Sequence, residues 1–326
     1  MSPNYTPEES DGGIIVNAYE MNRRLGRGVN VLGYDPVWKS RSKARMHDKH
    51  FRLIREAGFN SVRITLHPFR DAGIDDENRI TDAWFGTLDW AVGQSLSNGL
   101  AAILDFHEYG AMGKDPMGNK GRFLAAWEQM AERYRDYADN VVFEVLNEPN
   151  VKLTPELWNR FHGEAMAIIR SKNRSRAVII GPGSWNSIDY LEKLDLPEND
   201  RNIIVTIHYY SPFEFTHQGA SWSDQSDKVG IEWRGSNEEH RAINKDFQKA
   251  HAWAERHDRP LFLGEFGAYD KADMDSRARY VNHVARQAED MGWSWAYWQF
   301  DSDFIVYDIT HDKWIEPIRY ALIPPK

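Results

Sequence analysis

Two glutamates in this sequence stand at the ends of short apolar runs, a position from which an acid can act on a substrate. Glu148 follows the run Val-Val-Phe-Glu-Val-Leu-Asn and precedes Pro149. Glu265 follows Pro-Leu-Phe-Leu-Gly, with Gly267 close behind. Proline cannot donate to a sheet ladder and keeps the preceding residue extended, so we expect Glu148 at the C-terminal end of a buried strand. One such glutamate could be half of an ion pair, but two of them indicate acid/base and nucleophilic chemistry.

The elements that must position these acids alternate regularly along the chain. Apolar runs predict eight buried strands, at residues 28–34, 61–66, 101–106, 141–146, 177–181, 202–207, 261–264 and 294–298. Helical patterns lie between and after them, at residues 43–57, 84–96, 123–137, 154–171, 187–194, 237–257, 276–291 and 314–322. This alternation, without a linker-like break, predicts an α/β fold, a single (β/α)8 TIM barrel. We expect residues 1–326 to form one catalytic domain in which residues 1–11 are a mobile head.

Composition narrows the function classes. The chain has 40 Lys and Arg against 49 Asp and Glu, a net charge of −9, and its basic residues are scattered, so we expect no nucleic acid partner. There is no cysteine, which excludes disulfides and thiol catalysis. No apolar stretch approaches the roughly 18 residues of a membrane span, so we expect no membrane partner, and we expect a monomer. The compartment is unknown from sequence: we expect secretion with the signal peptide absent from this sequence, and a cytoplasmic location is the alternative.

Polar side chains gather where the predicted strands end, and a barrel of this type places its active site at that end. Each has a structural alternative: Arg63 could pair with a core acid, either histidine could be a hydrogen-bonded structural residue, and Trp298 could belong to the core. Six of eight strands ending in hydrogen-bonding or stacking groups is more than packing requires. Besides the two glutamates, the candidates are Arg63, His107, Asn147, His208, Tyr210, Trp298 and Gln299.

Two carboxylates with such neighbours point to glycoside hydrolysis. Glu265 is the expected nucleophile, kept ionised by donors such as Arg63 and a tyrosine hydroxyl. Glu148 is the expected acid/base, with its protonated form favoured by a less polar pocket and by the negative charge of Glu265. Asn147 can bond a sugar hydroxyl, and Trp298 can stack on a sugar ring.

The long segment 211–235 follows the sixth predicted strand and is rich in aromatic residues. A loop of this length inside a compact domain is usually functional or disordered, and Phe213, Phe215, Trp222 and Trp233 favour function. We expect it to form a wall of the cleft in which Trp222 and His217 contact the polymer. Packing of Trp222 inside the loop is the alternative.

The motifs Asn147-Glu148-Pro149, His208 with Tyr210, Gly264-Glu265-Phe266-Gly267 and Tyr297-Trp298, with Arg63 and His107 upstream, resemble glycoside hydrolase family 5, the cellulase and mannanase family. The resemblance covers about residues 26–323, and residues 206–219 are similar to bacterial endoglucanases of this family, some of which also cleave mannan. It implies a (β/α)8 barrel, retention of anomeric configuration and no metal or other cofactor. It also implies that Glu148 is the acid/base and Glu265 the nucleophile, supported by Arg63, His107, Asn147, His208, Tyr210 and Trp298.

We therefore predict a retaining endo-acting glycoside hydrolase that cleaves β-1,4-glucan, a β-linked polysaccharide or oligosaccharide. A β-mannanase or a bifunctional glucanase/mannanase is the first alternative, and a non-catalytic carbohydrate-binding barrel is the second. A metal-dependent hydrolase is disfavoured because the first strand lacks a His-x-His cluster. Glu108 stands where relatives often have a second histidine, Gln299 where they often have Glu, and residues 32–38 do not match well. These departures concern substrate preference.

Overall fold

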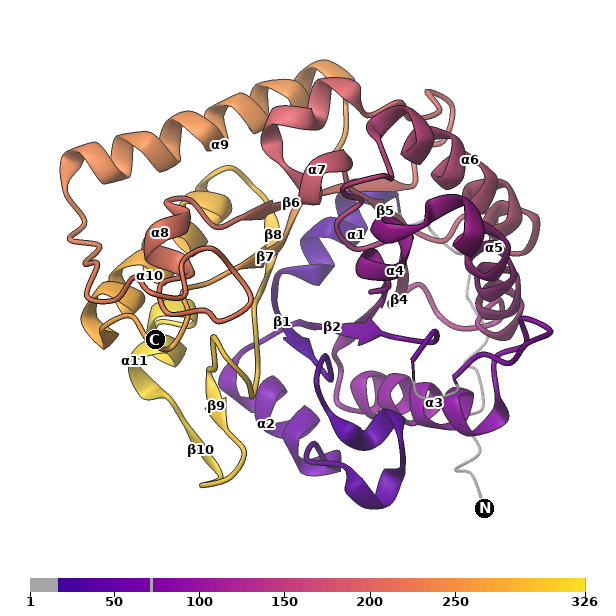
Figure 1. The fold of residues 1–326 in the computed structure, drawn as a ribbon, viewed down its shortest axis with the longest axis horizontal. Coiled ribbons are helices and arrows are strands. Elements are labelled where there is room, and N and C mark those ends of the chain that lie inside the picture. The colour runs from indigo at the N-terminus through magenta and orange to yellow at the C-terminus, as the bar shows by residue number, and fades with distance from the viewer. Residues whose placement is uncertain (1–16, 71–72, 326) are drawn as a thin grey trace.

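The eight predicted strands form a closed parallel barrel in the order β1 to β8, each hydrogen-bonded to its neighbours in sequence, with β8 closing on β1 (Figure 1). This computed structural model describes residues 17–70 and 73–325, so the expected mobile head at residues 1–11 lies outside the described part. The (β/α)8 prediction is confirmed. The strands are β1 (Arg27–Val31), β2 (Ser61–Leu66), β3 (Ala101–Phe106), β4 (Val141–Glu144), β5 (Val178–Ile180), β6 (Ile203–Tyr209), β7 (Leu261–Phe266) and β8 (Ser294–Tyr297).

Helices surround the barrel on all sides in Figure 1. Their ends follow local chemistry: Thr154 caps the start of α6 from its side chain with Pro155 at the first position, and Gly58 ends α2 with a left-handed backbone. The α-helices are α1 (Ala18–Leu25), α2 (Asp48–Ala57), α3 (Asp82–Ser97), α4 (Tyr109–Lys114), α5 (Pro116–Arg133), α6 (Pro155–Lys172), α7 (Gly183–Asn186), α8 (Phe213–Thr216), α9 (Asn237–His257), α10 (Met274–Asp290) and α11 (Glu316–Leu322). Short 3-10 helices occupy Pro36–Trp38, Arg41–Lys43 and Ile188–Lys193.

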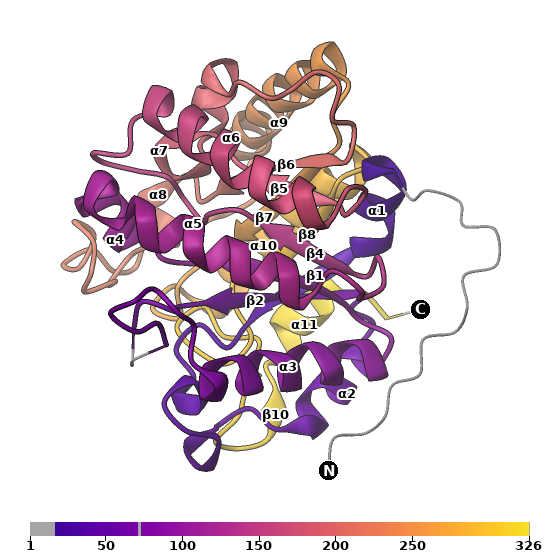
Figure 2. The same cartoon turned by 90° about the vertical axis from the view of Figure 1, so that its right-hand side faces the viewer.

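The apolar core has two parts. The larger fills the space between the strands and the surrounding helices, and the smaller lies inside the barrel. Ala18, Met21 and Leu25 of α1 belong to this inner part, together with small and branched residues of the strands. Figure 2 shows α1 at one end of the barrel and α4 and α8 at the other. The helix α1 therefore closes the end of the barrel opposite to α4 and α8.

Several expected boundaries are wrong. The segment before β1 contains the helix α1, which the sequence did not lead us to expect. The helix expected at residues 123–137 is α5, which begins earlier because Asp115 caps it and Pro116 suits its first position. The first strand ends at Val31 rather than residue 34, because Leu32 has a positive φ of 67°. The helix expected from residue 43 begins at Asp48. The last helix starts late because a small antiparallel pair, β9 (Tyr307–Asp308) and β10 (Lys313–Trp314), precedes it.

One irregularity in the barrel bears directly on the site. The parallel register between β6 and β7 pairs Ile207 with Leu263 but His208 with Glu265, so Gly264 is an extra residue on β7. A side chain on Gly264 would have its Cβ 2.5 Å from the hydroxyl of Thr206 and 3.0 Å from Nε2 of His208. This bulge sets Glu265 beside His208, and only glycine fits where the bulge meets the side chains of Thr206 and His208.

Candidate active site

A cavity of about 850 Å³ opens at the C-terminal ends of the strands. It is lined by nine of the candidates, which come from five strand ends and the segment 211–235: His107, Asn147, Glu148, His208, Tyr210, His217, Trp222, Glu265 and Trp298. Arg63 does not line the cavity. It is fully buried beneath it and donates a hydrogen bond to Glu265, which does line the cavity. The structure therefore brings together all the sequence candidates except Gln299.

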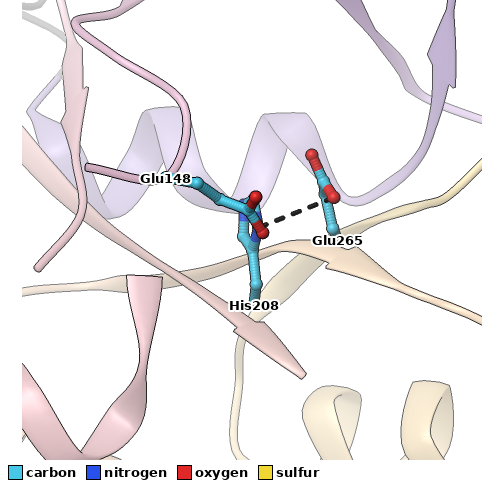
Figure 3. Close-up of side chains that lie close together, drawn as sticks. All are labelled: Glu148, His208 and Glu265. Atoms are coloured by element: carbon cyan, nitrogen blue, oxygen red, sulfur yellow. Dashed lines mark hydrogen bonds and ion pairs between the residues drawn. The ribbon is translucent and has the colours of Figure 1, made fainter. Parts of the chain in front are cut away.

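The two glutamates face each other across a short gap, with His208 between them (Figure 3). One carboxylate oxygen of Glu148, one of Glu265 and a ring nitrogen of His208 all lie within 4.8 Å of one another. Retaining glycosidases hold their carboxyl groups about 5 to 5.5 Å apart, whereas inverting enzymes need about 6.5 to 9.5 Å to admit a water. The separation fits direct attack by one carboxylate.

Glu265 accepts two hydrogen bonds that favour its charged form. Nη1 of Arg63 donates to one oxygen at 2.8 Å, and the hydroxyl of Tyr210 donates to the other at 3.0 Å. Burial nevertheless raises the pKa of Glu265 to about 7. Each donor opposes that rise, because it stabilises the anion rather than the acid.

Arg63 is the centre of a buried polar network beneath the cavity. Its guanidinium forms a fork with both oxygens of Glu144, at 2.7 and 2.8 Å, and lies 3.1 Å from Asp105. It also donates to Asn30 and Asn147, each at 2.8 Å. A core acid was the expected alternative partner of Arg63, and the structure shows two such partners, Asp105 and Glu144, in addition to Glu265.

Sequence reasoning did not select Asn30, Asp105 or Glu144. A signal for two of them was present: Asp105 and Glu144 are charged residues inside otherwise apolar strands, and a charge in that position needs a partner. Burial raises the pKa of Asp105 to about 7 despite the nearby guanidinium.

His107, Asn147 and Trp298 form a second connected group. His107 bonds to Asp105 through Nδ1 at 2.5 Å, and its Nε2 lies 3.4 Å from the amide nitrogen of Asn147. The imidazole stacks on the Trp298 ring with centroids 5.4 Å apart and planes 6° from parallel. Trp298 is therefore fixed by an aromatic neighbour while part of it lines the cavity.

Glu148 has a different environment from that of Glu265. Among the described residues, its one side-chain hydrogen-bond partner is His208, whose Nδ1 lies 2.8 Å from Oε1. Burial raises the pKa of Glu148 to about 8, and burial lowers the pKa of His208 to about 4, so this pair consists of a neutral imidazole and a carboxyl group of high proton affinity. Glu148 also has a positive φ of 44°, an uncommon conformation for a residue with a side chain.

Glu148, His208 and Glu265 form the single group among the described residues whose donor atoms are spaced to hold a metal ion. These atoms already take part in hydrogen bonds, however. Glu265 accepts from Arg63 and Tyr210, and Glu148 shares a hydrogen bond with His208. A guanidinium 2.8 Å from Glu265 also repels a cation. The donor set suits hydrogen-bonded carboxylates better than a resident metal.

The segment 211–235 supplies part of the cavity wall, as expected, but its aromatic residues divide. Phe213 and Trp222 are 43% and 55% exposed and line the cavity. Phe215 and Trp233 are buried in the core, so they do not line the cleft. Trp222 packs its edge against Tyr269, with centroids 4.9 Å apart, and His217 stacks on Phe213. Contact of Trp222 and His217 with the polymer stays a prediction.

Two exposed aromatic residues at the cavity were missed. Tyr34 follows β1 and is 55% exposed, and Trp185 follows β5 and is 49% exposed. Each is an aromatic residue that closely follows the end of a strand, and this position could have identified both of them from the sequence.

Of the departures from the family pattern, Gln299 and Glu108 do not line the cavity, whereas Tyr34 within residues 32–38 does. Gln299 is buried, and its Nε2 has no hydrogen-bond partner among the described residues. Glu108 is also buried, and it accepts the backbone N–H of Phe69 at 2.6 Å, which holds the segment after β2. Burial raises the pKa of Glu108 to about 7. The influence of Gln299 on a bound sugar stays a prediction.

A parallel barrel with two carboxyl groups this close at the C-terminal ends of its strands has the architecture of a barrel glycosidase. Comparison with protein-family models gives a match to Cellulase (glycosyl hydrolase family 5) over residues 23–303. The chain belongs to glycosyl hydrolase family 5, as the sequence resemblance indicated.

Similar proteins agree with this assignment. Endoglucanase H of Acetivibrio thermocellus is 30% identical over 328 residues, which is 95% of this chain and 34% of that protein. Two solved structures of Thermotoga maritima Cel5A, one in complex with cellobiose and one with mannotriose, are each 40% identical, with a TM-score of 0.88 over 94% of this chain and all of that chain. The chain spans about a third of the length of Endoglucanase H and half that of Endoglucanase 3 from Fibrobacter succinogenes. Among the described residues, no helix has the length and apolar character to cross a membrane.

Proposed function

We propose that this chain is a retaining endo-β-1,4-glucanase, with Glu265 as nucleophile and Glu148 as acid/base. The observation that carries the proposal is the short gap between the two carboxyl groups, whose nearest oxygens lie within 4.8 Å, combined with their unlike surroundings. Glu265 has two donors that favour its anion, whereas the side-chain partner of Glu148 within the described part of the chain is a neutral imidazole. The endoglucanases among the similar proteins support the same reaction class.

In the first step, the Glu265 carboxylate attacks the anomeric carbon, and the bond to the leaving oxygen breaks. Glu148 gives its proton to that oxygen, so a neutral alcohol leaves and a glycosyl-enzyme ester forms at Glu265. Burial raises the pKa of Glu148 to about 8 and that of Glu265 to about 7, so near neutral pH the proton resides preferentially on Glu148.

In the second step, water enters from the side that the leaving group vacated. Glu148, now a carboxylate, takes a proton from this water, and the oxygen attacks the anomeric carbon and releases Glu265. His208 donates to Glu148 in that charged state, at 2.8 Å. Two displacements on one carbon return the original anomeric configuration.

Mannan is the second candidate substrate, because a structure 40% identical to this chain is described in complex with mannotriose. Release of reducing ends from carboxymethyl cellulose, barley β-glucan, glucomannan and xylan separates the alternatives. We expect the two glucans to be cleaved faster than glucomannan. Cleavage of none of the four would favour the carbohydrate-binding barrel.

Chemical rescue tests the two roles separately. In Glu265→Ala, azide can reach the anomeric carbon directly, and an activated β-cellobioside should give the α-glycosyl azide. In Glu148→Ala, Glu265 still forms the ester, and azide should intercept it to give the β-azide. Each variant should lose on the order of 10³-fold or more in turnover on unactivated polymer. Exchanged azide products would reverse the roles, and near-normal activity of both variants would refute the proposal.

A further inference from the structure

The turn after β5 has an unusual backbone. Ser184, Trp185 and Asn186 have φ values of 56°, 59° and 56°, so three consecutive residues with side chains adopt the left-handed conformation. This conformation is strained for residues with side chains, and the surroundings must offset the strain. The N–H of Trp185 donates to the carbonyl of Pro149 at 3.1 Å, so the turn is tied to the residue that follows Glu148.

The same turn places the amide of Asn186 inside the protein, fully buried against Gly181. A Cβ on Gly181 would lie 2.1 Å from Oδ1 of Asn186, so the glycine makes room for this amide. On its other side, Nδ2 of Asn186 lies 3.2 Å from Nε2 of His208. Oδ1 has no hydrogen-bond partner among the described residues. Among the described residues, the hydrogen-bond partner of this amide is therefore His208, the histidine that contacts Glu148.

An amide nitrogen is a donor only, so the Nε2 that it contacts must be the acceptor. His208 then carries its proton on Nδ1, and that proton points to Oε1 of Glu148 at 2.8 Å. Reversing the amide would exchange these roles: Nε2 would carry the proton, and Nδ1 would accept one from Glu148. It would also leave two N–H donors unpaired at Gly181, and unpaired donors are rarer in proteins than unpaired acceptors.

We propose that Asn186 is a positioning residue that fixes the Nδ1–H tautomer of His208 and so keeps the acid proton of Glu148 on Oε2, the oxygen that does not contact the histidine. With Oε1 occupied as an acceptor, the proton of Glu148 resides on Oε2, free to reach the leaving oxygen. With the opposite tautomer, the proton would be held between Oε1 and Nδ1 and withheld from the substrate. This inference rests on the proposed function.

Several charged or titratable groups face His208, and any pH profile reflects all of them. They are Arg63 on β2, His107 after β3, Glu144 on β4, Glu148 after β4 and Glu265 on β7. For this reason the test combines a direct reading of the tautomer with a comparison of leaving groups at constant pH.

The tautomer can be read by long-range 1H–15N correlation spectra of protein labelled with [15N]histidine, in which His208 is the signal absent from His208→Gln. We expect the proton on Nδ1 in the native protein. Asn186→Asp keeps the shape of the side chain but offers only acceptors, so it should move the proton to Nε2. Asn186→Gly removes the amide while tolerating the positive φ, and it should leave no preference for Nδ1.

The catalytic consequence is measured as kcat/KM on two substrates that differ only in the leaving group. Phenyl β-cellobioside needs a proton from Glu148, whereas 2,4-dinitrophenyl β-cellobioside does not. In both Asn186 variants, kcat/KM should fall about 10-fold or more on the first and less than about 3-fold on the second. Asn173→Asp is the matched control, because it removes a buried amide donor to Ala131 far from the cavity. It should leave the ratio of the two substrates unchanged.

The outcomes separate the two hypotheses. An Nδ1 proton retained in Asn186→Asp, or equal losses on the two substrates, would overturn the positioning role. A native protein that cleaves neither cellobioside would refute the proposed function and with it the catalytic consequence, and the spectra would still decide the tautomer.

Discussion

The floor and the wall of the cavity are built in opposite ways. The floor is made of strand residues whose polar atoms bond to one another, and the guanidinium at its centre has no exposed surface. The wall is made of segments after the strands, and its aromatic residues Trp222, Trp185 and Phe213 are 43 to 55% exposed. Replacing a charged side chain in the floor leaves a buried charge without its partner, whereas replacing an exposed side chain in the wall changes stability little. Reaction and substrate preference can therefore vary independently.

The largest effect should come from breaking the centre of the floor with Arg63→Met. This change leaves Asp105 and Glu144 buried without their cation, and the loss of one partner of such a pair costs about 3–5 kcal/mol. The uncompensated acids have a higher pKa folded than unfolded, so the folded state binds more protons and the penalty grows as pH rises above about 4. Chemical denaturation at pH 5 and pH 8 measures it.

The control for Arg63→Met is Arg52→Met on the exposed face of α2, which should change stability by less than about 0.5 kcal/mol. An Arg63 variant as stable as this control at pH 8 would contradict the account of the floor.

A smaller effect is expected from Tyr210→Phe, which removes one donor to Glu265. Losing a hydrogen bond to the anion raises the pKa of Glu265, so the acidic limb of the kcat/KM profile should move to higher pH than in the native protein. A hydrogen bond to a charged group of about 1.5 kcal/mol corresponds to a loss of about 10-fold in kcat.

Tyr209→Phe is the natural comparison for Tyr210→Phe, since the neighbouring hydroxyl donates to Asp246 instead. It should leave the acidic limb in place. If both variants shift the limb equally, the bond from Tyr210 to Glu265 has no special influence.

The smallest effect is expected in the wall, from Trp222→Ala. Loss of one stacking contact of about 1 kcal/mol should raise KM on polymer about 5-fold while kcat stays within about 2-fold. Tyr320→Ala, an exposed aromatic residue on α11, should change neither constant. An unchanged KM for the Trp222 variant would show that this residue does not contact the polymer.

The sequence predicted what depends on local pattern and missed what depends on packing. Buried runs gave all eight strands, and barrel geometry then gathered Glu148, Glu265 and the other strand-end residues at one mouth. The helix α1 was missed because it is stabilised by packing against the end of the barrel. Its eight residues are of mixed polarity and do not indicate that packing.

The remaining omissions have a common physical cause. The turn that carries Asn186 contains no glycine at its three left-handed positions, so no residue type marks it. The partners of Arg63 were not paired in advance, because two strand acids could each have bonded elsewhere.

The bulge at Gly264 has a consequence for how this barrel can change over generations. Strand side chains alternate between two faces, so inserting or deleting one residue reverses every position beyond it. Leu263 lies in the core and Glu265 lines the cavity, although two residues apart in a regular strand would share a face. The extra residue therefore changes the alternation of side chains along β7, so that Glu265 faces the cavity. If Gly264 filled an ordinary paired position instead of the bulge, Glu265 would face the helices. Changes of length are consequently confined to the loops, and any transplant of this site to another barrel must carry β6 and β7 together.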